Sequence, residues 1–179
     1  ENVNTKDFVF NVVEHSDSSI VMQLPFSNGG YIQQKYTLPA GSYMVHNELS
    51  FVGMDGMIPR NVSMFDIDWS VVIPRLEKGY KNEKQYSKLD YYFSGEEEVE
   101  EIARGKDESE SVSSRIQWFA FQQQFFSAIV TPAQQFENAK FNVRYADEAA
   151  YAAGDLMHCE AIMKSSFDAG AENVVASCE

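Results

Sequence analysis

The stretch Arg115-Ile-Gln-Trp-Phe-Ala-Phe-Gln-Gln-Gln-Phe-Phe-Ser-Ala-Ile-Val-Thr-Pro132 is the most apolar and most aromatic segment of the chain. Its five rings belong to Trp118, Phe119, Phe121, Phe125 and Phe126. A buried ring removes roughly 150 to 250 Å² from water, a gross gain of about 4 to 6 kcal/mol at about 25 cal/mol per Å². Because a whole domain is stable by only about 5 to 15 kcal/mol, most of these rings must be covered, by the chain's own core or by a partner.

The spacing within this stretch predicts a short helix followed by a strand. Apolar side chains recur at intervals of three, four and four residues in Trp118, Phe121, Phe125 and Ile129. These intervals place the four side chains on one face of a helix, whereas strand alternation would add a glutamine and a serine to the aromatic face. We therefore expect a helix over residues 116–124 and a strand over residues 125–131, which Pro132 ends.

The rest of the chain has the pattern of short strands separated by turns. Upstream, β-branched and aromatic residues alternate or cluster over residues 7–13, 19–24, 31–38, 42–52, 64–74 and 89–93. Asn28-Gly29-Gly30 is the clearest turn signal between them. Downstream, strands are expected over residues 140–145 and 156–167, with a small-residue connector over residues 147–154. The pattern predicts an all-β fold, an antiparallel β-sandwich.

Size and composition limit the possible functions. A chain of 179 residues fits a single domain over residues 1–179. Its 27 acidic and 14 basic residues give a net charge of −13, which opposes long-range attraction to phosphate backbones or anionic lipid. We therefore expect no nucleic acid partner. The two cysteines, Cys159 and Cys178, lack a disulfide-scaffold pattern, so two unpaired residues are favoured over a disulfide.

The chain lacks the sequence features of a membrane span or of a secretory signal. No stretch reaches the roughly 18 consecutive apolar residues that a spanning helix requires, and the first residues contain no signal-like apolar block. The first residue is Glu1 and the last four are Ala-Ser-Cys-Glu. We expect a soluble piece of a longer protein.

No motif in the sequence predicts catalysis, a cofactor or a metal. Glycine-rich phosphate loops, Gly-x-Ser-x-Gly, Cys-x-x-Cys and His-x-x-x-His are all missing from it. Asp66 and Asp68 fit the polar face of a strand better than a metal site, and the three histidines are far apart. In the trio at residues 158–160, alternation along a strand lets only His158 and Glu160 share a site.

Two charged segments flank the strand predicted over residues 89–93. The segment over residues 75–88 is locally basic and offers a candidate docking loop at Lys78, Lys81 and Lys84, although a solvated loop is the simpler interpretation. The acidic run over residues 96–101 lacks the spaced ligands and the glycine of a calcium loop. We interpret the acidic run as solvent-exposed surface.

The aromatic stretch also carries a family resemblance. Trp118-Phe-Ala-Phe-Gln-Gln-Gln-Phe-Phe-Ser-Ala-Ile-Val130 resembles a pattern of tryptophan, alanine, glutamine, paired aromatics and alanine in the periplasmic domain of YidC, the bacterial Oxa-type membrane-protein insertase. Upstream of this stretch, other features similar to the family occur in the family's order. They are Lys35-Tyr36, Leu38, Gly41, Tyr43 and the segment over residues 80–88. The phrases over residues 49–56 and 58–63 are similar to the Bacteroidetes branch, and the resemblance covers about residues 30–145.

The resemblance implies a fold and a function. The fold would be a β-super-sandwich like that of galactose mutarotase, and the chain a non-catalytic fragment of a periplasmic domain at the inner membrane. It would help a chaperone and insertase to insert and fold inner-membrane proteins, with Sec translocon components and nascent membrane proteins as partners. The family's membrane anchor and insertase core are not in this sequence. The candidate partner or core residues are those of the motif: Trp118, Phe119, Phe121, Gln122, Phe125 and Phe126.

Two alternatives from other functional classes remain open at this point. A carbohydrate-binding or mutarotase-like sandwich would fit the implied fold, but aldose epimerases use paired histidines and a glutamate as general acid and base, and this chain has only scattered histidines. A surface lipoprotein or adhesin domain would also fit an all-β chain. Core packing of the aromatic stretch is favoured over an interface role, because the surrounding strands can cover most of its rings.

Overall fold

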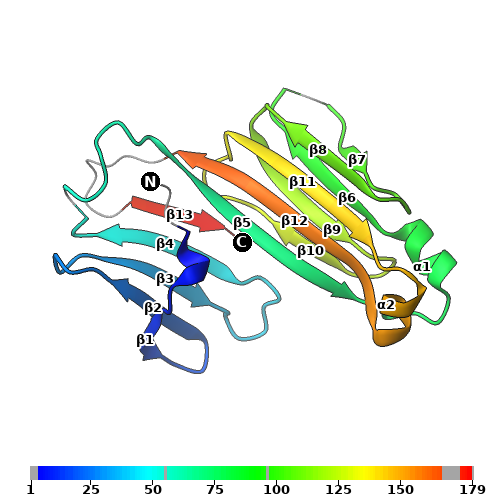
Figure 1. Ribbon diagram of the computed structural model, residues 1–179, viewed down its shortest axis with the longest axis horizontal. Coiled ribbons are helices and arrows are strands. Elements are labelled where there is room, and N and C mark those ends of the chain that lie inside the picture. The colour runs from blue at the N-terminus through cyan, green and yellow to red at the C-terminus, as the bar shows by residue number, and fades with distance from the viewer. Residues whose placement is uncertain (1–3, 55, 96, 167–173, 179) are drawn as a thin grey trace. The chain divides into compact units, whose positions relative to one another are not determined.

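The computed structural model describes residues 4–54, 56–95, 97–166 and 174–178. The chain forms two compact units, one made of Glu1–Met64 with Phe167–Glu179 and the other of Phe65–Ser166. We call them unit 1 and unit 2. Strands dominate both units (Figure 1), so the predicted all-β, antiparallel fold is confirmed.

Unit 1 is a single five-stranded sheet in the order β1-β2-β3-β4-β13. A short 3-10 helix, η1 (Thr5–Asp7), comes before its first strand. Every pairing in the sheet is antiparallel, and the first four strands follow each other as a meander. Its strands are β1 (Asn11–His15), β2 (Ser19–Pro25), β3 (Tyr31–Thr37), β4 (His46–Val52) and β13 (Val174–Cys178).

The turn predicted at Asn28-Gly29-Gly30 connects β2 to β3 and packs against the end of β4. Gly29 has a φ of 87°, which glycine adopts without steric cost. The Asn28 side chain accepts a hydrogen bond from Gly30 N at 2.9 Å and donates one to the Gly53 carbonyl at 3.0 Å. A Cβ on Gly30 would lie 2.3 Å from that carbonyl oxygen, so only glycine fits there.

Unit 2 is a sandwich of two four-stranded sheets. The first, which we call the hairpin sheet, has the order β10-β9-β6-β7, and the second, the long-strand sheet, has the order β5-β12-β11-β8. The hairpin sheet contains β6 (Lys88–Phe93), β7 (Glu100–Ile102), β9 (Ile116–Gln122) and β10 (Ser127–Val130). The long-strand sheet contains β5 (Met64–Pro74), β8 (Glu108–Val112), β11 (Asn138–Tyr145) and β12 (Asp155–Ser166).

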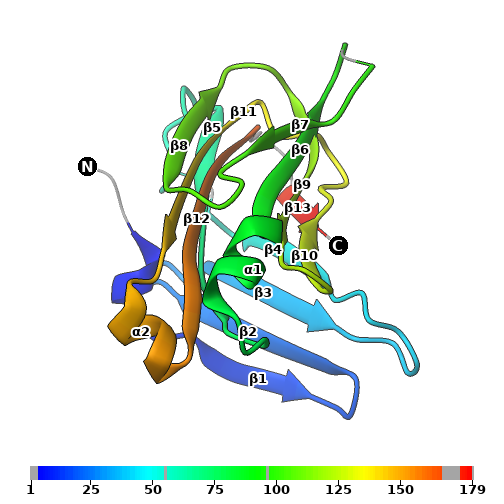
Figure 2. The same cartoon turned by 90° about the vertical axis from the view of Figure 1, so that its right-hand side faces the viewer.

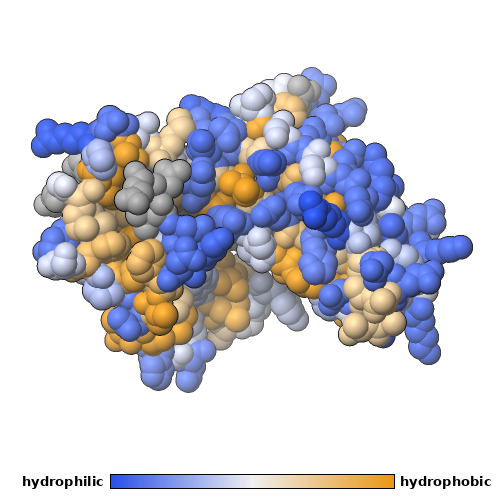
Figure 3. Space-filling view, viewed as in Figure 1, coloured by the Kyte–Doolittle hydropathy of each residue, from blue (hydrophilic) through white to orange (hydrophobic). Residues whose placement is uncertain are grey.

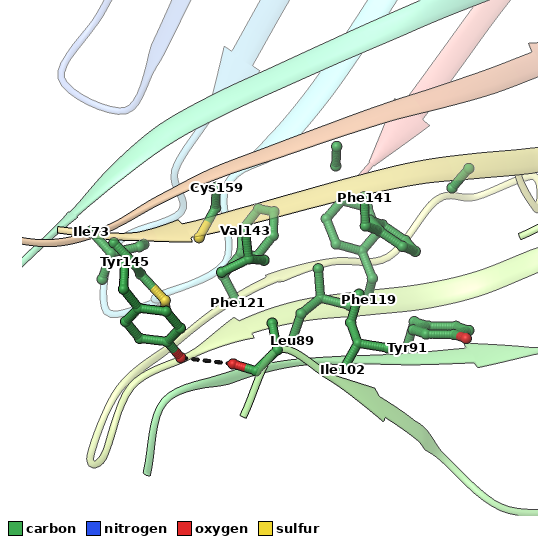
Figure 4. Packing of buried hydrophobic residues seen from close by; sticks show 14 of the residues in the cluster. Ile73, Leu89, Tyr91, Ile102, Phe119, Phe121, Phe141, Val143, Tyr145 and Cys159 are labelled. Atoms are coloured by element: carbon green, nitrogen blue, oxygen red, sulfur yellow. Dashed lines mark hydrogen bonds between the residues drawn. The ribbon is translucent and has the colours of Figure 1, made fainter. Parts of the chain in front are cut away.

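The core of unit 2 lies between these two sheets, because the strands expose alternate residues. On β11, every second side chain is buried, including Phe141 and Val143. Phe119 and Phe121 of β9 meet Phe141 and Trp69 from the opposite sheet, with ring centroids 5.2 to 5.9 Å apart. Figure 4 shows Phe119, Phe121 and Phe141 together with aliphatic residues that fill the space around them.

The predicted helix over residues 116–124 is wrong. Residues of β9 pair with β6 on one side and β10 on the other. The pairing with β6 skips Gln117, because Tyr92 pairs with Trp118 while Phe93 pairs with Ile116. This irregularity lets Ile116 and Phe119, three residues apart, both enter the core. The intervals that resembled a helix instead joined residues of different environments, because Trp118 and Ile129 lie on the outer face, Phe121 is in the core and Phe125 is in the turn.

Other boundaries were also mispredicted. The expected loop over residues 75–88 contains the helix α1 (Tyr80–Tyr86), and the expected connector over residues 147–154 contains the helix α2 (Glu148–Ala153). Asp147 caps α2 by accepting a hydrogen bond from Ala150 N at 2.8 Å, a signal typical of helix starts. The strand expected over residues 42–52 begins only at His46. The strand expected over residues 7–13 is η1 followed by β1.

Candidate functional site

The aromatic stretch forms a hairpin whose turn is held by buried glutamine contacts. Strands β9 and β10 pair from Gln122 with Ser127 to Phe119 with Val130. Gln123 is buried, and its backbone N–H donates to the Phe126 carbonyl at 2.7 Å. Its side-chain amide donates to the Pro74 carbonyl at 2.6 Å. The turn is therefore fixed both within the hairpin and to the end of β5.

Helix α1 lies beside this turn, as Figure 2 shows from the side on which both face the viewer. The side-chain amides of Asn82 and Gln124 connect the helix to the turn at 3.5 Å. Glu83 is fully buried, and its carboxylate accepts hydrogen bonds from Leu76 N at 2.8 Å, Glu77 N at 3.2 Å and the Tyr151 hydroxyl at 3.0 Å. These bonds satisfy the carboxylate and fix the segment that enters the helix.

The hydroxyl groups of two tyrosines connect α1 and its last residues to other segments of unit 2. The Tyr80 hydroxyl donates to the Ala146 carbonyl at 2.6 Å. The Tyr145 hydroxyl lies 2.6 Å from the Ser87 carbonyl and 2.9 Å from the Ala103 carbonyl, and Figure 4 draws a hydrogen bond of this hydroxyl. Burial raises the pKa of Tyr145 above its usual value, so the hydroxyl keeps its proton and remains a donor at neutral pH.

The three predicted docking lysines have different environments. The Lys84 ammonium sits over the rings of Tyr145 and Tyr80, 4.8 and 5.5 Å from their centroids, and therefore belongs to the scaffold. Lys78 and Lys81 are exposed, and within the described ranges neither has a hydrogen-bond or ion-pair partner. Only these two lysines remain candidates for docking, and Lys81 lies on the helix and not in a loop.

The six predicted motif residues separate into a buried group and an outward group. Phe119 and Phe121 are buried in the core and cannot contact a partner. Phe125 and Phe126, in the turn, are 68% and 63% exposed. Trp118 and Gln122 point to the outer face of the hairpin sheet, where both are partly exposed. The periodicity could not separate these groups, because the predicted helical face combined Phe121 with Phe125.

The outer face of the hairpin sheet carries an apolar strip made of Tyr92, Trp118 and Ile129 around the buried Ala120, which we call the Trp118 strip. Trp118 stacks on Tyr92, with ring centroids 6.3 Å apart and an interplanar angle of 23°. Ile129 pairs with Ala120 across β10 and β9 and is 55% exposed. Within the described chain, β10 pairs only with β9 and is the edge strand of this sheet. The strip therefore borders an open sheet edge.

Charged residues occupy the other edge of the same sheet. Glu101 of β7 lies between Arg104, which donates to both carboxylate oxygens, and Lys88, whose ammonium is 2.9 Å away. The hydrogen bonds from Arg104 contribute most to lowering the pKa of Glu101, and those from Lys88 add to them, so that it falls to about 2. Lys88 also pairs with Asp90 at 2.9 Å. The charges of this cluster are paired with one another, which suits a sheet edge that does not bind a further strand.

A shallow groove of about 680 Å³ lies on the outer face of the long-strand sheet. Arg144 and His158 form one cross-strand pair in it, and Asn142 and Glu160 form the next. This agrees with the prediction that only His158 and Glu160 of their trio share a side, because Cys159 between them is buried. Figure 3 shows mainly hydrophilic residues over this side of unit 2, with scattered apolar ones between them.

Two observations describe the metal-binding and thiol chemistry of the groove. Cys159 is a free cysteine, and burial raises its pKa to about 12, which keeps the thiol protonated and unreactive. The side chain of Cys178 lies outside the described part of the chain. Over the part of the chain that the structure describes, no group of three or more His, Cys, Asp or Glu residues is arranged to hold a metal ion. The exposed Asp66 lies 3.7 Å from Lys164, as expected of a solvated strand face.

Comparison with known proteins gives the chain a family. The model of the YidC periplasmic domain matches residues 2–169. A protein of Bacteroides fragilis named "Membrane protein insertase YidC" is 37% identical over 135 residues, which cover 75% of this chain and 22% of that protein. Proteins of the same name from Phocaeicola vulgatus and Porphyromonas gingivalis are 32% identical over 168 residues and 31% identical over 139 residues. These alignments cover 94% and 77% of this chain, and 26% and 22% of the two relatives.

The chain therefore spans about a quarter or less of the length of these relatives. No helix within the described residues combines the length and the apolar character needed to cross a bilayer. The matched region includes all of unit 2 and, in unit 1, the strands β1 to β4, but not β13. On the extent of this match, the chain belongs to the YidC periplasmic domain family.

Proposed function

We propose that this chain is a non-catalytic accessory module of a membrane-protein insertase, held at the periplasmic face of the bacterial inner membrane. The family description and the relatives' printed name support this proposal. In this account the module provides a docking surface for other proteins of the insertion process. Sec translocon components and emerging membrane-protein segments are the partners that we propose.

The Trp118 strip is the surface that we assign to protein partners, and it is the observation on which the docking proposal depends. The inner side of the hairpin sheet is filled by the core, whereas its outer side keeps a stacked tryptophan–tyrosine pair and a half-exposed isoleucine. Tryptophan and tyrosine are enriched among the residues that dominate binding energy at protein interfaces. The open edge at β10 also offers backbone groups to an extended partner segment.

Binding to purified Sec translocon components tests this assignment. We expect the immobilised chain to bind them in detergent solution, and Trp118→Ala to weaken binding about tenfold or more, as truncation of an interface hot spot does. Lys140→Ala is the matched control, because Lys140 is an exposed residue of the opposite sheet. A folded wild-type chain that binds no Sec component would overturn the docking proposal, and equal loss in both variants would place the docking surface elsewhere.

A further inference from the structure

We propose that the tip of the β9–β10 hairpin contacts an anionic lipid surface, with Phe125 and Phe126 entering the bilayer interface and Lys78 and Lys81 pairing with lipid phosphates. This inference rests on the proposed function, because only a protein attached to a membrane keeps this chain beside a bilayer. We name these four residues the hairpin tip. It is separate from the Trp118 strip, which we assign to proteins.

The apolar part of the hairpin tip is unusually exposed for an otherwise well-packed sandwich. Phe125 and Phe126, at 68% and 63%, are the most exposed large hydrophobic residues described in unit 2. Tyr86 is also exposed and lies four residues after Asn82 on α1, hence on the helix face turned to the hairpin. Phenylalanine and tyrosine rings at a projecting surface suit the interfacial zone of a bilayer, where aromatic side chains concentrate.

The turn is held in a way that presents these rings together. Gln123, just before them, is buried and bonded to Pro74, and Gln124 is bonded to Asn82 of α1. The backbone bond from Gln123 N to the Phe126 carbonyl closes the turn at 2.7 Å. The fixed turn therefore keeps the two phenylalanine rings at the surface, although the inner face of the same sheet packs against an apolar core. A fixed turn loses little conformational entropy when it binds.

The charge beside the rings is complementary to lipid phosphate. The segment over residues 75–84 contains four basic and two acidic residues in a chain of net charge −13. One of these acids, Glu83, is buried and hydrogen-bonded, which leaves Glu77 as the acid of the segment at the surface. Lys78 and Lys81 have no ion-pair or hydrogen-bond partner among the residues that the structure describes. Basic residues close to a surface of anionic lipid are attracted to it, within a Debye length.

A lipid surface fits this tip better than a protein partner does. A stable protein interface buries about 800 Å² on each side, whereas the tip consists of two rings on the turn and two exposed lysines at the start of the neighbouring helix α1. Rings flanked by cations are the combination by which peripheral proteins bind bilayers. The relatives' printed name makes them insertases of membrane proteins, which in the proposed function act beside a bilayer.

Vesicle sedimentation with the complete 179-residue chain tests the proposal. We expect the chain to sediment with vesicles of phosphatidylglycerol and phosphatidylethanolamine more than with vesicles of pure phosphatidylcholine. The double variant Phe125→Ser with Phe126→Ser should lower the bound fraction at least fivefold. Lys78→Glu with Lys81→Glu should lower it on the anionic vesicles, and wild-type binding should fall as salt is raised. Controls are Tyr43→Ser, which removes an exposed ring of unit 1, and Lys140→Glu.

Three kinds of result would contradict the proposal that the hairpin tip binds lipid. Absence of binding to anionic vesicles, or binding that the Phe125 and Phe126 substitutions leave unchanged, overturns the proposal. Self-association that these substitutions abolish, seen in analytical ultracentrifugation without vesicle binding, assigns the tip to a second copy of the chain. Loss of Sec component binding in the same variant, without vesicle binding, assigns it to a protein.

The two proposals fail separately. Trp118→Ala should leave vesicle binding unchanged, whereas the hairpin-tip variants should leave binding to Sec components unchanged. Lipid binding without any Sec binding would contradict the proposed docking function and keep the lipid proposal. Circular dichroism and urea unfolding of each variant show whether it is folded, and because the four tip residues are exposed, we expect all of them to fold.

Discussion

Four phenylalanines within eight residues of the hairpin have two distinct environments. Phe119 and Phe121 contact the rings of the opposite sheet, at centroid distances of 5.2 to 5.9 Å. Phe125 and Phe126 face solvent from the turn. The stability of unit 2 should therefore depend on the first pair, and the proposed contact with lipid on the second.

Replacing a phenylalanine of each pair by alanine should separate these roles. Phe121→Ala should lower the free energy of unfolding by about 3 to 5 kcal/mol, because it opens a cavity in the core. Phe125→Ala should change it by no more than about 0.5 kcal/mol, as surface substitutions do. Urea unfolding measures both. Similar losses in the two variants would contradict the burial of one ring and the exposure of the other.

Trp118 should contribute less to stability than a core ring does. It is partly exposed and stacks on Tyr92, so Trp118→Ala loses one ring contact and part of an apolar surface. We expect a loss of about half or less of the 3 to 5 kcal/mol that a buried aromatic residue costs. Thermal or urea unfolding checks this expectation. A loss as large as that of Phe121→Ala would mean that Trp118 is part of the core.

The Glu101 cluster predicts a pH dependence. The pKa of Glu101 is lowered from its usual value to about 2 by Arg104 and Lys88. The ionised carboxylate therefore stabilises the fold fully above about pH 4.5, and this contribution is lost as pH falls toward 2. Because the cluster is partly exposed, Glu101→Gln should cost no more than about 1 kcal/mol at pH 7. The wild type and variant should converge in urea unfolding at pH 2 to 3, and a constant difference across this range would contradict the assignment.

At the scale of the element, α1 and the hairpin were the parts that sequence patterns predicted least well. The intervals in the aromatic stretch fitted a helix because they combined the buried Phe121 with Trp118 and Ile129 of the outer face, on two strands joined by a turn. Helix α1 was overlooked because its seven residues are mostly polar and its position depends on Glu83, whose partners lie elsewhere in the chain. The longer strands with plain alternation, such as β5, β11 and β12, were predicted closely. Periodicity therefore worked where neither an irregularity nor a distant contact was involved.

Glu83 should control the position of α1. Glu83→Ala leaves the Leu76 and Glu77 N–H groups without their acceptor and removes one of the two acceptors of the Tyr151 hydroxyl, which keeps the Glu77 carbonyl at 2.8 Å. Loss of partners for buried polar groups costs about 1 to 3 kcal/mol each at most sites. We expect at least that loss in urea unfolding, and faster amide exchange over residues 75–86. Tyr86→Ala is the matched control on the exposed face of the same helix, and equal exchange in both variants would argue against the anchoring role.

At the scale of the whole molecule, the pattern of strands and turns predicted the all-β class, and the aromatic motif with the upstream features predicted the family. The sequence did not predict two units. Their boundary at Met64 and Phe65 falls in β5, which the pattern showed as one uninterrupted alternating strand. Sequence periodicity also could not predict which contacts the side chains of the candidate site make. The roles of Gln123, Glu83 and Tyr145 depend on hydrogen bonds to residues up to 68 positions away.

We propose that the two units nevertheless fold as a single domain over residues 1–179. Strand β13, near the end of the chain, pairs with β4, so unit 1 is completed only after all of unit 2 has been made. Urea unfolding followed by tryptophan fluorescence reports unit 2, which contains both Trp69 and Trp118. Amide exchange over β2 and β3 reports unit 1. We expect the two transitions to coincide, and two separated midpoints would show that the units unfold independently.

Site-specific photocrosslinking tests the docking account most directly. A photoreactive amino acid would replace Ile129, in the Trp118 strip, within the complete insertase in its own membrane. We predict crosslinks to a Sec translocon component from position 129, and none from the control position Ser111 on the exposed face of the opposite sheet. Crosslinks to a Sec component from Ser111 but not from position 129, or from neither position, would contradict the account.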